Sequence, residues 1–130
     1  MNLPDSTILV VDDDDSLSEL YKINLEKLGC NVIAVNNSDD AISLYTQAIN
    51  SNTPIDIVIL DLNIPGSLSG KEIASEIRKI DPVAKLIVSS GNSASPEMTQ
   101  YQEHGFNAAI EKNFNRANIK QVVEKVLGET

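Results

Sequence analysis

The chain has 130 residues and a formal charge of −9 at pH 7, with a sequence pI near 4.4. This length suits one domain with one sizeable core, and the charge argues against binding nucleic acid or an anionic membrane through bulk electrostatics, since both partners are polyanions. No apolar run approaches the roughly 20 residues that span a bilayer, and the first residues do not resemble a signal peptide. We therefore expect a cytoplasmic protein that binds neither nucleic acid nor a membrane.

Apolar runs of strand length alternate along the chain with segments of helical spacing. The strand-like runs are residues 8–11, 32–35, 55–60, 86–88 and 108–110. The helical segments are residues 17–28, 41–49, 73–77, one starting at 95, and 119–127. Gly29 is expected to end the first helix, Ser38 to cap the second and Ser95 to cap the fourth. The pattern predicts five strands and five helices in alternation.

Strands that alternate with helices pair in parallel through right-handed crossovers, so the sequence predicts an α/β fold whose sheet is covered on both faces. The runs at 8–11 and 55–60 are continuously apolar, as expected of central strands buried on both sides. In such sheets the ligand binds beyond the carboxyl ends of the strands. The residues just after each run are therefore the candidates for a functional site.

Four of the five predicted strands are followed by acidic, hydroxyl or basic residues. In chain order these are Asp12 to Asp15, Asp61, Ser89 with Ser90, and Lys112. Carboxylates that converge at one edge repel one another, so some must be protonated or a cation must join them. Aspartate oxygens suit Mg²⁺, which often binds through one or two carboxylates together with a phosphate. Asp14 and Asp15 are interpreted instead as acids in the first turn of the following helix.

Four segments resemble the receiver domains of two-component response regulators, and the resemblance covers nearly the whole chain. They are ILVVDD at 8–13, VILDLNIPG at 58–66, LIVSSG at 86–91 and EKNF at 111–114. The resemblance implies a flavodoxin-like (βα)5 fold, with a doubly wound parallel five-stranded sheet in the order 2-1-3-4-5. It also implies a single receiver domain over residues 1–130, without an effector domain. The chain is similar in particular to receivers associated with hybrid sensor kinases.

The resemblance also implies a role for each candidate residue. Asp61 would accept a phosphoryl group from a histidine kinase or a histidine phosphotransfer protein. Ser89 would bind that group through its hydroxyl, and Lys112 would pair with it. The implied ligands of Mg²⁺ (or Mn²⁺) are Asp12, Asp13, Asp61 and the backbone carbonyl of Asn63. Such a domain catalyses only its own phosphorylation and dephosphorylation, signals by protein contact, and is expected to form a homodimer, if any, through its fourth helix, fifth strand and fifth helix.

Three positions depart from the family pattern. Asn113 follows the lysine where the family usually has a proline in a cis peptide bond, and a cis bond without proline costs about 3 to 4 kcal/mol, so this loop is either strained or trans. Ala109 stands where a switching Tyr or Phe is usual, and Gly70 comes one residue later than usual. These departures keep open a receiver-like module that binds proteins without being phosphorylated.

Two other classes with related chemistry fit the sequence less well. A haloacid-dehalogenase-like phosphatase needs a second aspartate two residues after its nucleophile, but the residue there is Asn63, which cannot act as a general acid. A flavodoxin-type electron carrier cradles its phosphate in a loop rich in Ser, Thr and Gly. Four consecutive aspartates in that loop would repel the flavin phosphate.

Overall fold

The computed structural model describes residues 5–62, 64, 66, 68–92 and 94–128. Within these ranges five parallel strands form one sheet in the order β2-β1-β3-β4-β5. The strands are β1 (Thr7–Val11), β2 (Asn31–Val35), β3 (Ile57–Asp61), β4 (Leu86–Ser90) and β5 (Ala108–Glu111). This order confirms the predicted flavodoxin-like fold.

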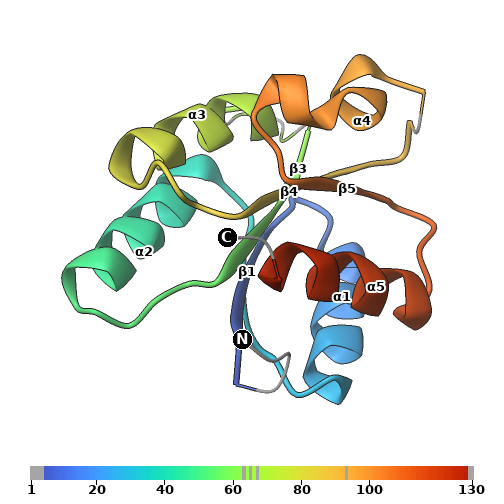
Figure 1. Cartoon of the computed structure of the whole chain (residues 1–130), viewed down its shortest axis with the longest axis horizontal. Coiled ribbons are helices and arrows are strands. Elements are labelled where there is room, and N and C mark those ends of the chain that lie inside the picture. The colour runs from blue at the N-terminus through green and yellow to red at the C-terminus, as the bar shows by residue number, and fades with distance from the viewer. Residues whose placement is uncertain (1–4, 63, 65, 67, 93, 129–130) are drawn as a thin grey trace.

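Helices cover both faces of the sheet, with α1 and α5 on one side and α2, α3 and α4 on the other (Figure 1). Their bounds are α1 (Asp15–Lys27), α2 (Ser38–Asn50), α3 (Gly70–Ile80), α4 (Pro96–Thr99) and α5 (Arg116–Leu127), with a 3-10 helix, η1 (Tyr101–His104), after α4. A search of the described residues finds no helix with the length and apolarity needed to cross a membrane.

Two of the helix starts differ by one residue from the prediction. Asn37, not Ser38, caps α2, because the Asn37 side chain accepts a hydrogen bond from the amide of Asp40 at 2.8 Å. Asn and Ser are equally good caps, so composition alone could not separate two neighbours. Asp14 caps α1 by accepting from the amide of Leu17 at 3.2 Å, whereas only Asp15 lies inside the first turn as expected.

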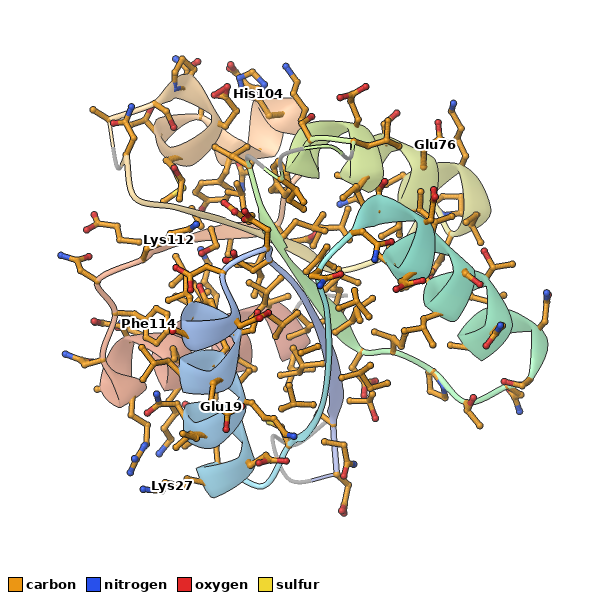
Figure 2. The ribbon with its side chains drawn as sticks, turned by 180° about the vertical axis from the view of Figure 1, so that it is seen from behind. Glu19, Lys27, Glu76, His104, Lys112 and Phe114 are labelled. Atoms are coloured by element: carbon orange, nitrogen blue, oxygen red, sulfur yellow. The ribbon has the colours of Figure 1, made fainter. Side chains whose placement is uncertain are left out.

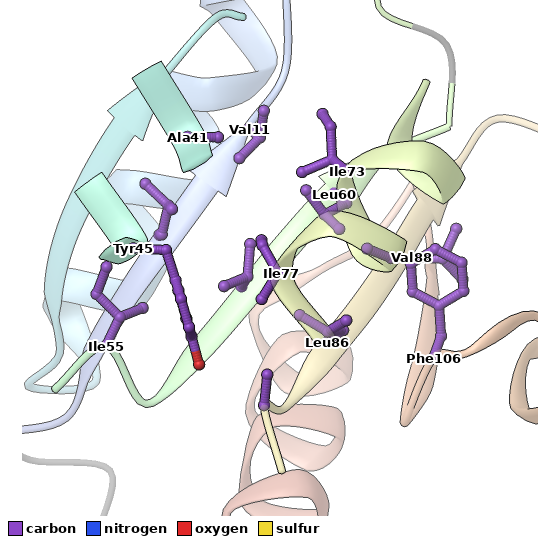
Figure 3. Packing of buried hydrophobic residues seen from close by; sticks show 14 of the residues in the cluster. Val11, Ala41, Tyr45, Ile55, Leu60, Ile73, Ile77, Leu86, Val88 and Phe106 are labelled. Atoms are coloured by element: carbon purple, nitrogen blue, oxygen red, sulfur yellow. The ribbon is translucent and has the colours of Figure 1, made fainter. Parts of the chain in front are cut away.

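The core has two parts, one on each side of the sheet. Figure 3 shows the larger part, where side chains of α2 and α3 pack on β1, β3 and β4. The smaller part lies under α1 and α5. Leu20 and Ile49 have the spacing of the apolar faces in the predicted segments 17–28 and 41–49. In the structure they are 50% and 44% exposed, so each helix buries fewer of its apolar residues than the spacing predicts. As predicted from their continuous apolar runs, β1 and β3 are buried on both faces, and β4 is buried in the same way.

Candidate functional site

The carboxyl ends of the strands bring the predicted site residues together at one edge of the sheet. Asp61 is the last residue of β3 and lies in register with Ser89 of β4. Asp12 directly follows β1, and its amide donates to the carbonyl of Val35 at 3.1 Å. Lys112 directly follows β5, and its amide donates to the carbonyl of Ser90 at 3.1 Å. Backbone hydrogen bonds therefore hold each of these residues where its strand ends.

Three of the predicted metal ligands form a compact acidic group. One carboxylate oxygen each from Asp12, Asp13 and Asp61 lies within 4.8 Å of the others. Asp12 and Asp61 are only 2% and 3% exposed, whereas Asp13 faces solvent. The fourth predicted ligand, the carbonyl of Asn63, falls outside the described residues. The side chains present thus offer a hard cation one open and two buried sources of oxygen.

The ammonium group of Lys112 lies against two of these carboxylates. Its Nζ is 3.0 Å from Oδ1 of Asp61 and 3.6 Å from Oδ2 of Asp12. Figure 2 labels Lys112 beyond the end of β5, above Phe114. Burial by itself would lower the pKa of Lys112, but its hydrogen bond with Asp61 and the charge of Asp12 outweigh burial and raise it. The lysine therefore keeps a positive charge inside the site.

Asp12 is the member of the acidic group whose negative charge is least well stabilised. Its Oδ1 accepts a hydrogen bond from the amide of Asp14 at 2.9 Å, whereas its buried Oδ2 has no hydrogen-bond partner. Burial and the charge of Asp61 raise the pKa of Asp12 from 3.8 to about 6, although the bond from Asp14 opposes the rise. Within the described residues Oδ2 of Asp12 has only the ammonium of Lys112, at 3.6 Å, and no hydrogen bond. A buried carboxylate oxygen without a hydrogen bond is costly, and a divalent cation would satisfy it. The chemistry of this group therefore fits Mg²⁺.

Ser89 is hydrogen-bonded to Tyr21, which lies in the predicted helical segment 17–28 and was not among the candidate site residues. The Oγ of Ser89 lies 2.7 Å from the hydroxyl oxygen of Tyr21, which comes from α1 on the same face of the sheet. The sequence feature that could have indicated this contact is a tyrosine at a position of the apolar helix face otherwise formed by leucines. A buried tyrosine hydroxyl usually needs a hydrogen-bond partner, but the sequence does not say which.

Gly70 allows α3 to start directly against the end of β3. Its amide donates to the carbonyl of Leu62 at 3.1 Å, and a Cβ at this position would overlap the carbonyl oxygen of Asp61. Ser69 and Glu72 close a capping box around the same helix start. The extra residue before Gly70 therefore does not disturb this close approach.

The loop after β5 has a trans backbone. No cis peptide bond occurs among the described residues, which include Lys112 and Asn113, so the trans alternative holds. With this geometry Lys112 still reaches Asp61. Ala109, which stands where the family usually has a switching Tyr or Phe, packs with its methyl group against the core on the face of α2 and α3. The departure at Asn113 thus leaves Lys112 within ion-pair distance of Asp61.

A parallel α/β sheet whose strand ends hold an acidic group, a hydroxyl and a lysine defines a class of signalling domain. In agreement, residues 8–124 match the family model of the response regulator receiver domain. The chain belongs to this family, which places it in two-component signalling. Neither the phosphatase nor the electron carrier considered above is supported by this match.

Several known proteins resemble the chain over almost all of its length. The transcription factor SKN7 of Candida albicans is 28% identical over 124 residues, which are 95% of this chain and 21% of that protein. The hybrid signal transduction histidine kinase L of Dictyostelium discoideum is 26% identical over 91% of this chain and 7% of its own length. A receiver domain protein from Clostridium thermocellum superposes with a TM-score of 0.81 at 27% identity and 94% coverage of both chains. The chain thus spans about a fifth or less of these two curated relatives, one of them a hybrid kinase.

Proposed function

We propose that this receiver is a phosphoacceptor in which Asp61 takes a phosphoryl group in a Mg²⁺-dependent reaction. The donor would be a phosphohistidine of a histidine kinase or of a histidine phosphotransfer protein. The observation that carries the proposal is the position of Lys112, whose ammonium lies 3.0 Å from Asp61 in a group of three carboxylates. Such a site has a nucleophile, a fixed positive charge and the ligands of a hard cation in one place.

The chemistry assigns a task to each side chain. An oxygen of Asp61 attacks the phosphorus atom and forms an O–P bond while the P–N bond to the histidine breaks. The imidazole leaves with the electron pair of that bond and takes a proton from solvent water. The transition state is loose and spreads charge over the equatorial oxygens, so positioning and electrostatics dominate catalysis. Lys112 and the hydroxyl of Ser89 face that charge. When bound by Asp12, Asp13 and Asp61, Mg²⁺ supplies further positive charge for the same oxygens.

The proposal extends to partners and organisation. We propose that residues 1–130 act as one receiver domain in the cytoplasm and signal by docking on another protein. A homodimer through the surface of α4, β5 and α5 stays a prediction. Sedimentation velocity with and without a phosphodonor checks it, since a phosphorylation-dependent dimer would sediment faster only with the donor.

Intact mass spectrometry tests the phosphoacceptor role. The protein is incubated with acetyl phosphate and Mg²⁺, or with acetyl phosphate and EDTA, beside the variants Asp61→Asn and Asp39→Asn. Asp39 is a matched control because it is an exposed aspartate outside the acidic group. We expect the wild type and Asp39→Asn to gain the mass of one phosphoryl group with Mg²⁺ only, and Asp61→Asn to gain none.

Two results would contradict the proposal. A gain of mass that persists in Asp61→Asn would move the modification to another residue. The absence of any gain in the wild type, although Mg²⁺ binds, would favour the alternative of a receiver-like module that binds proteins without phosphorylation.

A further inference from the structure

The hydrogen bond between Tyr21 and Ser89 joins a helix to the functional site through the interior of the protein. Tyr21 is 0% exposed and Ser89 is 1% exposed, and their oxygens are 2.7 Å apart. One residue comes from α1 and the other from β4, so only the folded chain brings them together. Buried side-chain hydrogen bonds of this kind fix geometry, because neither group can exchange its partner for bulk water.

The surroundings of the pair decide which oxygen donates. Within the described residues, Ser89 is the hydrogen-bond partner of the Tyr21 hydroxyl. The ring of Tyr21 lies in the apolar core under α1 and α5, and the charges of Asp12 and Asp61 act on its hydroxyl without a hydrogen bond to it. If Ser89 donated to Tyr21, the phenol proton would be buried without an acceptor, at considerable cost. If Tyr21 donates, its buried proton has an acceptor. The Ser89 hydroxyl then accepts from Tyr21 and keeps its own proton for another acceptor.

The hydroxyl proton of Ser89 can be donated toward Asp61. Ser89 lies in register with Asp61 on the neighbouring strand, and residues in register share a face of the sheet. Burial raises the pKa of Tyr21, and the charges of Asp12 and Asp61 add to the rise, which outweighs the lowering by the hydrogen bond with Ser89. The phenol therefore stays protonated at neutral pH. A fixed donor behind Ser89 therefore leaves the serine proton for the oxygens that gather at Asp61.

The ring of Tyr21 is itself held in place by Phe114. The two ring centroids are 4.4 Å apart and the planes are tilted by 35°. Phe114 belongs to the loop between β5 and α5 that also carries Lys112, and Figure 2 shows Phe114 next to α1. The same aromatic contact thus anchors the tyrosine and the loop of the lysine.

We propose that Tyr21 is a positioning residue for phosphoryl transfer, and that its hydroxyl orients Ser89 so that the serine proton is donated to the phosphoryl group arriving at Asp61. This inference rests on the proposed phosphoacceptor function and goes beyond it, because it assigns a task to a buried residue of α1. Tyr21 touches neither the phosphoryl group nor a metal ion and acts only through Ser89.

The test compares four variants by the initial rate of phosphorylation at increasing acetyl phosphate concentration. They are Tyr21→Phe, Ser89→Ala, the double variant, and Tyr45→Phe. Tyr21→Phe removes one oxygen and keeps the ring against Phe114. We expect its maximal rate to fall roughly three- to tenfold, the range set by one neutral hydrogen bond, with the half-saturating concentration unchanged. In the Ser89→Ala background the same change should have no further effect.

Tyr45→Phe is the matched control for loss of a buried phenol. Its hydroxyl donates to Asp81 at 2.8 Å in the other part of the core, far from Ser89 in the fold. It should lose a comparable amount of stability in urea and keep the wild-type rate. A purely structural role of Tyr21 predicts instead that both tyrosine variants lower the rate in parallel.

A spectroscopic measurement supports the same test without altering Tyr21. Donation from Ser89 to a phosphoryl group strengthens the bond that Ser89 accepts. We expect a tyrosine ultraviolet difference spectrum on phosphorylation in the wild type and in Tyr45→Phe, and none in Ser89→Ala.

The possible failures are distinguishable. If the wild type is phosphorylated and Tyr21→Phe reacts equally fast, or if losses in the double variant are additive, the positioning role is overturned and the phosphoacceptor function stands. An absent difference spectrum in a phosphorylated wild type overturns it as well. If the wild type takes up no phosphoryl group at all, the proposed function fails and the role of Tyr21 fails with it.

Discussion

The ammonium nitrogen of Lys112 lies 3.0 Å from Oδ1 of Asp61, although β4 runs between the strands that carry the two residues. The long side chain of Lys112 spans the width of β4 from the end of β5. A positive charge is therefore fixed beside the atom that we propose as the nucleophile, before any phosphodonor arrives.

Replacing Lys112 by methionine should slow phosphorylation by acetyl phosphate roughly 100-fold or more, the usual cost of losing one preorganised electrostatic donor. The initial rate, followed by intact mass, measures this effect. Lys79→Met is the control, since Lys79 forms only an exposed pair with Glu76 at 3.2 Å. Equal rates for the Lys112 variant and the wild type would show that the lysine has no part in the transfer.

Asp12 should destabilise the metal-free protein at neutral and alkaline pH. Its pKa in the folded protein is about 6 against an ordinary value of 3.8, so the folded state favours the protonated form. That contribution to stability is present below pH 4 and is lost as the pH rises through 6. In EDTA at pH 8, Asp12→Asn should therefore raise the free energy of unfolding by about 1 to 3 kcal/mol.

Urea unfolding at pH 8 and pH 4 measures this difference, which should approach zero at the lower pH. Asp39→Asn serves as the control, because an exposed acid in the first turn of α2 is favoured by the helix dipole. Its replacement should lower stability slightly rather than raise it. A destabilised Asp12→Asn protein at pH 8 would contradict our inference that the charge of Asp12 is poorly stabilised.

Mg²⁺ should raise the melting temperature at pH 7.5, and EDTA should reverse the effect. A ligand at 100 times its Kd stabilises by about 2.7 kcal/mol, which shifts the melting temperature of a domain of this size by several degrees. At pH 5 a carboxyl with a pKa near 6 is about nine tenths protonated. The apparent Kd should then weaken about tenfold. Differential scanning fluorimetry across a Mg²⁺ titration measures the apparent Kd at pH 7.5 and at pH 5. Equal Kd values at the two pH values would exclude Asp12 as a ligand.

Gly70→Ala should damage both stability and phosphorylation. Alanine normally favours a helix over glycine, but here its Cβ would overlap the carbonyl oxygen of Asp61 and push α3 away from β3. We expect a loss of about 1 to 3 kcal/mol and a slower transfer. Gly128→Ala is the matched control, because its Cβ meets only ordinary contacts at the end of α5. A Gly70 variant as stable as the wild type would show that α3 can shift freely.

Much of the fold and site could be predicted from the sequence, for reasons that individual residues illustrate. The continuous apolar run before Asp61 identifies a buried central strand, and the acidic and basic residues after the runs mark the edge where a site forms. Helix boundaries were less predictable. Asn37 and Ser38 are equally suitable caps, and the choice between them depends on how α2 docks, with Ser38 accepting from the amide of Leu68.

Contacts between side chains of different helices and strands could not be predicted from sequence patterns. Tyr21 has the spacing of any core residue, and its bond with Ser89 exists only because the fold brings α1 and the end of β4 together. The raised pKa of Asp12 likewise depends on burial and on the neighbouring charge of Asp61.

The sequence alone thus determined the alternation of strands and helices, the family and the residues that line the edge of the sheet, because periodicity and local residue chemistry are properties of short segments. The tertiary structure alone decided that Oδ2 of Asp12 has no hydrogen bond within the described residues, that Lys112 reaches Asp61 with a trans peptide bond after it, and that Tyr21 holds Ser89. These are relations between groups distant in the chain, and distance and burial set their energies.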